Sequence, residues 1–188
     1  MVVRDRSLTT VEEFERILAK PEHQDRLLEL IDGEIVEKMP TQEHSEVAGN
    51  IYATLRAFVK PQKLGRVGFE VRHAVPGDQH NDRLPDVSYT EGYDEAVKKG
   101  SVPQMPDLAV EVKSPNDKLP KMQAKAEYYL NNGSKLVWLV FPDSKEVIQI
   151  TRDAEGNFQQ QTFTIEHTLQ TGEVLPGFTM SVKDVFDV

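Results

Sequence analysis

Two acidic residues and a lysine near the middle of the chain have the types and the spacing that a hydrolytic metal site needs. Asp86 follows a proline in one short apolar segment, and Glu111 and Lys113 stand two residues apart in a later one. Side chains two apart on a β-strand leave the same face of its sheet. Carboxylate oxygens suit Mg²⁺ or Mn²⁺, and a lysine beside them can hold an attacking water or stabilise charge on a phosphate.

This candidate site requires that two particular strands lie side by side. If the strand with Asp86 pairs with the strand with Glu111, both carboxylates converge with the main-chain carbonyl of Val112. Residues 108–113 are mostly apolar, which favours burial, and a buried Glu or Lys is costly without a partner or a function. The alternative is a solvated strand face with weak ion pairs, because acids and lysines at this spacing are common.

Two further residues bear on the choice of metal ligands. Asp107 also follows a proline, but it precedes Glu111 by four residues, which is ~13 Å along a straight strand. Ligands that lie ~2.0–2.6 Å from one ion cannot be so far apart, so Asp86 is the expected ligand and Asp107 is expected to begin the strand. His73 alternates with valines, which places it on a sheet face rather than at a metal.

The elements that must position these residues follow from apolar periodicity, capping residues and turn residues. A capping box predicts a helix over 10–20, and an Asp-Gly pair supplies the turn of a hairpin over 26–39. Apolar residues at helical spacing predict a helix over 43–59, which Pro61 helps to end.

The second part of the chain is richer in strands, beginning with a strictly alternating strand over 67–75. The other expected elements are a strand over 84–90, a connection over 91–106 with a helical turn at 94–99, a strand over 108–113, a helix from Pro120 to Gly133, strands over 136–141 and 147–151, and a β-rich tail over 158–188. This order predicts an α/β or α+β sandwich with a mixed sheet. The chain has no internal repeat or linker, which predicts a single domain over residues 1–188.

The segments that carry these residues resemble PD-(D/E)XK nucleases. More narrowly, they resemble the Uma-type family of restriction endonucleases, formerly described as a domain of unknown function. The signature is Leu-Pro-Asp-Val-Ser at 84–88, followed by Val-Glu-Val-Lys-Ser-Pro-Asn-Asp at 110–117. Supporting stretches in the family's order are residues 28–34, His44 at a helix start, Lys125 with Tyr129 and Gly133, and residues 138–142. The likeness spans residues 27–150, which is most of the chain.

The resemblance implies a restriction-endonuclease-like fold, in which helices flank a central mixed sheet. The core would cover 27–150, with an extra N-terminal hairpin and a β-rich C-terminal extension over 158–188. Asp86, Glu111 and the carbonyl of Val112 would bind Mg²⁺, for which Mn²⁺ can substitute.

The resemblance also assigns catalytic roles. Asp86, Glu111 and Lys113 would form the catalytic triad. Many relatives take their lysine from the following helix instead, so Lys113 and Lys125 are both open as the catalytic lysine. His44 would lie near the metal, orienting water or contacting phosphate, whereas a half-exposed place at the helix start is the alternative. Two acids would be possible additions on the same side, Glu29 and Glu46.

The composition limits the functions open to the chain. It has 188 residues and no cysteine, with 22 Lys+Arg against 31 Asp+Glu and a net charge of −9. The lack of cysteine excludes disulfides, thiolate zinc sites, iron–sulfur clusters and a cysteine nucleophile. No apolar run approaches the ~20 residues that span a bilayer, and the N-terminus lacks the apolar stretch of a secretory signal, so we expect a cytoplasmic protein.

The distribution of charge matters more than its total. A net negative charge argues against loose coating of nucleic acid. Residues 98–135, however, contain seven lysines against four acids, a local net charge of +3. Lys118, Lys121 and Lys125 recur at helical spacing, and they either face a phosphate backbone or form a solvated helix face.

We therefore expect a metal-dependent endonuclease that hydrolyses phosphodiester bonds, with DNA as its substrate and with His44 and Lys125 supporting the phosphate. The alternatives are a catalytically inactive module on the same fold that binds nucleic acid or protein, and a structural homo-oligomer whose tail pairs between subunits. We expect a homodimer or higher homo-oligomer in each case, because the tail extends beyond the nuclease core. No Walker-type loop, dinucleotide fingerprint or Gly-x-Ser-x-Gly motif supports another chemistry.

Overall fold

A computed structural model describes residues 8–92 and 95–188 of the chain. The chain forms two compact units. The first comprises Met1–Met39, Arg72–Leu84 and Val97–Gln104, and the second comprises Pro40–Val71, Pro85–Ala96 and Met105–Val188.

The first unit contains a capped helix and a β-hairpin. Helix α1 (Val11–Leu18) is followed by the 3₁₀ helix η1 (Pro21–His23) and by strands β1 (Leu27–Ile31) and β2 (Glu34–Lys38), which pair antiparallel. The predicted capping box is present, since the Thr10 hydroxyl accepts from the Glu13 amide while the Glu13 carboxylate accepts from the Thr10 amide. Asp32 and Gly33 have φ of 49° and 78°, the left-handed conformation that a two-residue hairpin turn requires. Both local predictions are confirmed.

The second unit is built on a six-stranded mixed sheet in the order β3-β4-β5-β6-β7-β8. The strands are β3 (Gly65–Phe69), β4 (Val87–Glu91), β5 (Leu108–Val112), β6 (Leu136–Phe141), β7 (Glu146–Arg152) and β8 (Phe158–Thr164). Neighbouring strands are antiparallel except β5 and β6, which are parallel. A parallel pair needs a long crossover, which helix α3 (Leu119–Asn131) supplies.

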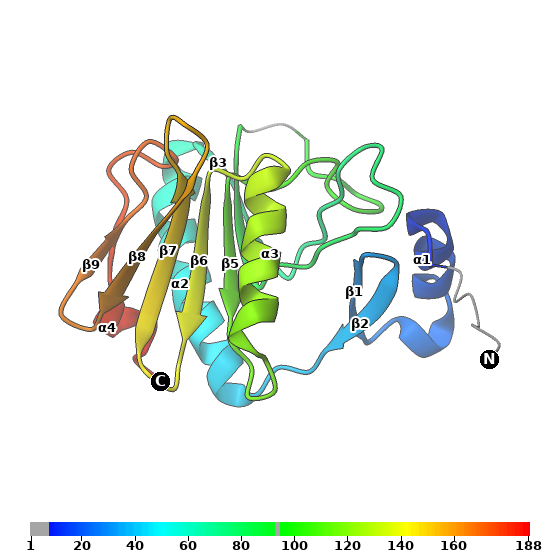
Figure 1. The fold of residues 1–188 in the computed structure, drawn as a ribbon, viewed down its shortest axis with the longest axis horizontal. Helices are drawn as coiled ribbons and strands as arrows, with labels where there is room; N and C mark the ends of the chain where they lie inside the picture. The colour runs from blue at the N-terminus through cyan, green and yellow to red at the C-terminus, as the bar shows by residue number, and fades with distance from the viewer. Residues whose placement is uncertain (1–7, 93–94) are drawn as a thin grey trace. The chain divides into compact units, whose positions relative to one another are not determined.

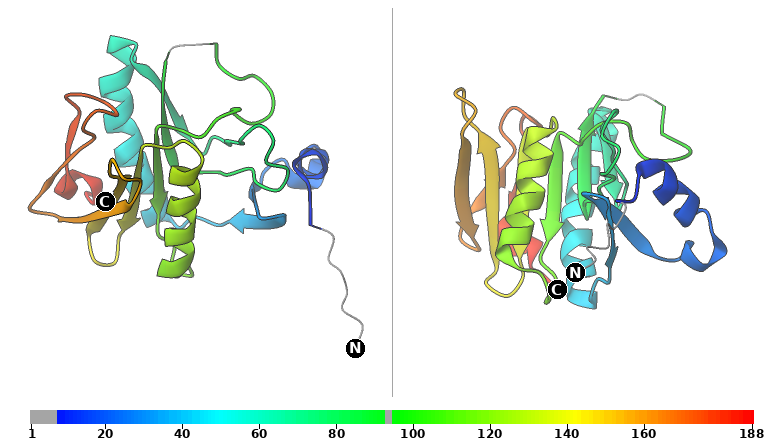
Figure 2. Two further views of the ribbon diagram at one scale, coloured as in Figure 1. Left: turned by 45° about the horizontal axis from the view of Figure 1, so that its top comes forward. Right: turned by 45° about the vertical axis from the view of Figure 1, so that its right-hand side comes forward.

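Two helices cover opposite faces of this sheet, as Figures 1 and 2 show. Helix α2 (Gln42–Gln62) packs on β3, β4 and β5, and α3 packs on β5, β6 and β7. Alternation along β5 sends Val110 and its even-numbered neighbours into the apolar core under α2, whereas Glu111 faces α3. The expected mixed sheet flanked by helices is confirmed.

The C-terminal tail completes the core on the α2 side. It contains β9 (Thr168–Gln170) and β10 (Thr179–Ser181), which form a separate antiparallel pair, and the short helix α4 (Val182–Val185). Seven of its apolar side chains are buried in that core: Leu169, Leu175, Phe178, Met180, Val182, Val185 and Phe186. The tail therefore buries these seven apolar residues within this chain, and the expected homo-oligomer stays a prediction.

Three elements have boundaries that differ from the sequence predictions by three residues or more. Helix α2 runs on through Pro61 and ends at Gln62, and its cap residue Lys63 has a left-handed φ of 54°. The strand predicted over 67–75 ends at Phe69, because Glu70 has a φ of 51° that breaks the extended backbone. The strand predicted over 84–90 begins later, at Val87.

Two further sequence expectations concern a helical turn over 94–99 and membrane-spanning segments. Of the helical turn predicted at 94–99, residue 94 lies outside the described residues, and residues 95–99 are irregular. Within the two described stretches, no helix is both long and apolar enough to cross a membrane.

Candidate active site

Asp86 and Glu111 lie at the same end of two neighbouring strands. β4 and β5 pair antiparallel with Val87 opposite Val110, so the two strands lie side by side as the candidate site requires. The Asp86 amide donates to the Val110 carbonyl at 3.0 Å, and the Asp86 carboxylate accepts from the Val112 amide at 2.6 Å. Asp86 therefore bonds to the residues on both sides of Glu111. The two acids are 1% and 3% exposed, so the solvated strand face is not what the chain adopts.

Two residues of α3 bind the Glu111 carboxylate. The Tyr129 hydroxyl donates to Oε1 at 2.7 Å, and the Lys125 ammonium lies 3.1 Å from Oε2. Lys125 and Tyr129 are one helical turn apart, which places them on the same side of α3. Each oxygen of this buried acid thus has its own donor, as a buried charge requires.

His44 binds Asp86 from the start of α2. The hydroxyl of Thr41 caps the helix by accepting from the His44 amide at 3.2 Å. The His44 side chain is buried, and its Nε2 lies 3.3 Å from the Asp86 carboxylate. The structure therefore places His44 beside the acidic pair and not in the half-exposed position that was the alternative.

The two candidate lysines have different partners. Lys125 pairs with Glu111, whereas the Lys113 ammonium lies 2.9 Å from Oδ2 of Asp143, in the turn between β6 and β7. Asp143 itself is largely exposed. Of the two lysines, Lys125 is thus the one that contacts the buried acid.

Asp107 lies at the opposite end of β5 from Glu111. Its carboxylate accepts from the Glu91 amide at 2.8 Å and pairs with Lys135 at 2.9 Å. The hydrogen bond to Asp107 raises the pKa of Lys135. Asp107 therefore ties strand ends together, as its expected place before the strand suggested.

Three other residues were considered as additional acids or as ligands. Glu46 is exposed on α2 and accepts from Gln42 at 2.7 Å. Glu29 is buried on β1 and belongs to the first unit, as does His73. The His73 Nδ1 lies 2.9 Å from the Gln104 carbonyl, and burial lowers the pKa of His73 to about 4.

Two of these residues had no role in the predicted site. Tyr129 entered only as part of the family pattern, although its spacing of four from Lys125 was a usable signal that both share one helix face. Asp143 offered no signal, because its contact with Lys113 joins residues thirty positions apart.

The donor set of this site fits a hard divalent ion that keeps much of its water. Within the described ranges, no group of three or more His, Asp and Glu side chains could hold a metal ion. The two buried carboxylates offer a smaller set. Mg²⁺ is commonly bound through one or two carboxylates with several waters retained, so the residues fit this kind of ion and not an all-protein cage.

The mixed sheet flanked by helices is the expected restriction-endonuclease-like fold, and the acidic pair lies at one end of its neighbouring strands β4 and β5. Residues 11–183 match the model of the Uma2 family, described as "Putative restriction endonuclease". The chain belongs to this family. Membership supports a nuclease function, that is, an enzyme that acts on phosphodiester bonds.

The fold is also that of a solved relative. A crystal structure from Anabaena variabilis ATCC 29413, described as a "putative nuclease belonging to DUF820", is similar with a TM-score of 0.76 and 24% sequence identity. The match covers 94% of this chain and 97% of the other. No curated protein matches the chain.

Proposed function

We propose that this protein is a metal-dependent endonuclease that hydrolyses phosphodiester bonds in DNA. The observation that carries the proposal is the pair of buried carboxylates, Asp86 and Glu111, bound at one end of adjacent strands by partners from α2, β5 and α3. Burying two carboxylates is costly, and structural stability alone is a weak reason to retain them.

The acidic pair would hold Mg²⁺, with Mn²⁺ as a substitute. The main-chain carbonyl oxygen of Val112 would be a third metal ligand. The Val112 amide bonds to Asp86, and the carbonyl of the same strand residue points to the same side. A divalent ion bound here lowers the pKa of a bound water and screens the charge of the scissile phosphate.

Lys125 is the lysine that we assign to the reaction. The attack forms a bond between a water oxygen and phosphorus, and the water loses a proton to solvent. The bond to the leaving sugar oxygen breaks, and that oxygen takes up a proton from solvent, while negative charge accumulates on the phosphoryl oxygens during the reaction. Lys125 contacts Glu111 and can stabilise that charge, whereas Lys113 is paired with Asp143. His44 fixes the Asp86 carboxylate and has a supporting role.

The experiment measures nicking of supercoiled plasmid DNA in Mn²⁺ or Mg²⁺. We expect Glu111→Gln to abolish nicking and Lys125→Ala to reduce it at least ~100-fold, whereas Lys113→Ala retains most activity. Glu127→Gln, which removes an exposed charge from the same helix, serves as the control, and circular dichroism checks that each variant is folded. Unchanged nicking by Glu111→Gln would refute the assignment of the site.

One observation favours the alternative of a binding module. The acidic pair already has basic partners in the chain, Lys125 and His44. The two buried carboxylates therefore do not need a bound metal ion to offset the cost of their burial. A binding module would keep its DNA affinity in chelator and would not nick DNA with either metal.

A further inference from the structure

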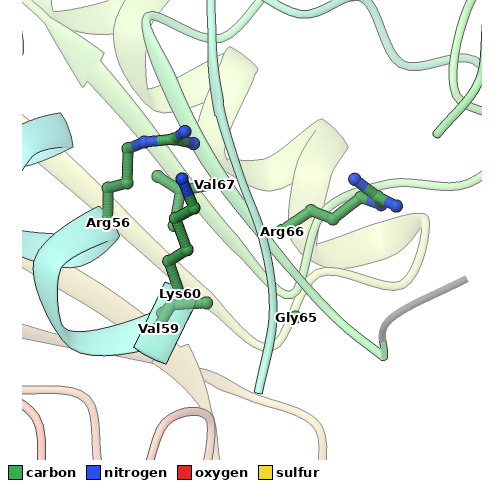
Figure 3. A pocket seen from close by; sticks show the side chains of 6 residues that line it. All are labelled: Arg56, Val59, Lys60, Gly65, Arg66 and Val67. Atoms are coloured by element: carbon green, nitrogen blue, oxygen red, sulfur yellow. The ribbon is translucent and has the colours of Figure 1, made fainter. Parts of the chain in front are cut away.

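A second cationic feature lies at the far end of α2 from His44. A pocket of about 140 Å³ opens there between α2 and strand β3 (Figure 3). It is lined by Arg56, Val59, Lys60, Gly65, Arg66 and Val67. Figure 3 shows the charged ends of Arg56 and Lys60 close together, with Arg66 directed away from them. The pocket thus presents two adjacent cations.

These two cations are not balanced by the chain itself. Among residues 8–92 and 95–188, no carboxylate lies within ion-pair distance of Arg56 or Lys60, although the chain carries a net charge of −9. The two residues are four apart on one helix, where like charges repel and destabilise the helix. Such repulsion is relieved when an anion binds between the two groups.

The Arg56 guanidinium is supported by aromatic rings. It lies 5.8 Å from the centre of the Tyr52 ring, which in turn makes an edge-to-face contact with Phe69 of β3 at 5.5 Å. A cation over an aromatic face keeps its donors available to a ligand. The planar guanidinium can bind a phosphate through two parallel hydrogen bonds, and Lys60 adds a point charge beside it.

The pocket and the acidic site are both in the second unit, and α2 connects them. Twelve residues of helix separate His44 from Arg56, and sixteen separate it from Lys60, which corresponds to about 18 and 24 Å along the axis. Phosphates of one strand of a duplex advance about 3.4 Å per base pair. A duplex that reaches both places must therefore extend at least about five to seven base pairs beyond the scissile phosphate.

We propose that Arg56 and Lys60 form an accessory site for a backbone phosphate of the nucleic acid whose scissile phosphate lies at Asp86 and Glu111. The contact of the scissile phosphate with Asp86 and Glu111 rests on the proposed nuclease function. The accessory contact is independent of base sequence, because it engages phosphate alone. It binds the nucleic acid at a point distant from the scissile bond.

The test is fluorescence anisotropy with a labelled 24-base-pair duplex in chelator, so that no cleavage occurs. The double variant Arg56→Gln/Lys60→Gln is compared with Lys20→Gln/Lys183→Gln, which removes the same charge at two exposed positions outside the pocket. Each lost phosphate contact lowers the slope of log affinity against log salt by ~0.9. The pocket variant loses one such contact, so its slope should fall by ~0.9 and its affinity by roughly 8-fold at 0.1 M salt. The control should stay close to wild type.

The outcomes separate the two proposals. A pocket variant that matches the control in affinity and salt slope, or a wild-type protein that does not bind the duplex, would overturn the accessory site. If the wild type nicks DNA and the pocket variant keeps its affinity, the nuclease proposal is supported and the accessory site is refuted. Pocket-dependent binding without nicking in Mn²⁺ would support the accessory site and refute the nuclease.

Discussion

Removing the Tyr129 hydroxyl should destabilise the protein measurably, although the change deletes a single atom. The Tyr129 ring is fully buried, and its hydroxyl donates at 2.7 Å to Glu111, which is itself 3% exposed. Tyr129→Phe keeps the ring and leaves one carboxylate oxygen without that donor. A hydrogen bond to a charged group contributes ~1.5–3 kcal/mol, so we expect the free energy of unfolding to fall by about 2 kcal/mol. In a chain of this length that corresponds to a melting temperature lower by about 4–8 °C.

The assay is urea denaturation, with differential scanning calorimetry as a second measurement. Tyr52→Phe is the matched control, since among the described residues the Tyr52 side chain makes ring contacts only. We expect that variant to lie within ~0.5 kcal/mol of wild type, as is usual for a change that breaks no buried interaction.

A double-mutant cycle isolates the interaction between the two groups. Glu111→Gln and Tyr129→Phe, measured singly and together, should show a coupling free energy of ~1 kcal/mol or more, as residues in one hydrogen-bond network do. A Tyr129→Phe variant as stable as wild type, or a coupling free energy near zero, would show that this hydrogen bond does not hold Glu111 in place.

Two other predictions concern stability. Burial lowers the pKa of His73 from 6.5 to about 4. As the pH falls below 6.5, this histidine is therefore protonated in the unfolded chain before it is protonated in the folded chain, which favours unfolding. The free energy of unfolding measured in urea titrations should decline from this cause by up to ~3 kcal/mol between pH 6.5 and pH 4. His73→Gln should remove this part of the decline. A Cβ added at Gly65 would press against the Thr90 carbonyl, whereas one added at Gly49 of α2 meets nothing within 4 Å. Gly65→Ala should thus lower the free energy of unfolding by ~1–3 kcal/mol and Gly49→Ala raise it by ~0.5–1 kcal/mol, and thermal melts with the same sign for both would contradict this reasoning.

Local signals in the sequence were reliable where the interaction itself is local. The capping box of α1 joins residues three apart, and the Asp32-Gly33 turn needs only two residues with positive φ. The apolar run that predicted β6 matches the observed strand, Leu136–Phe141, end to end. In each case the residues that decide the conformation are neighbours in the chain.

Predictions that depended on distant partners were less complete. The alternation over 67–75 fits one strand, but residues from Arg72 onward belong to the first unit, and periodicity carries no information on which unit a residue joins. Helix α2 continues for one residue past Pro61, although proline has no amide to donate to the helix, and it ends at Gln62, where Lys63 adopts the left-handed conformation of a C-cap.

The candidate site shows the same division. Spacing identified Asp86 and Glu111, and strand pairing brings them to one end of the sheet. Spacing also placed Lys113 beside Glu111, since residues two apart share a strand face. It could not reveal that the long side chain of Lys113 reaches Asp143 instead, because flexible ammonium groups choose their partners in three dimensions.

The contacts of Glu111 also determine the direction from which anything else can reach it. A carboxylate has two lone pairs on each oxygen, and here one on each accepts a hydrogen bond from a residue of α3. The lone pairs that Lys125 and Tyr129 do not use are those directed away from that helix. An ion that coordinated Glu111 through them would leave Lys125 and Tyr129 in their places. The carboxylate then works as a coupling between ion and helix, so that a displacement of α3 would alter the coordination and a bound ion would stiffen α3.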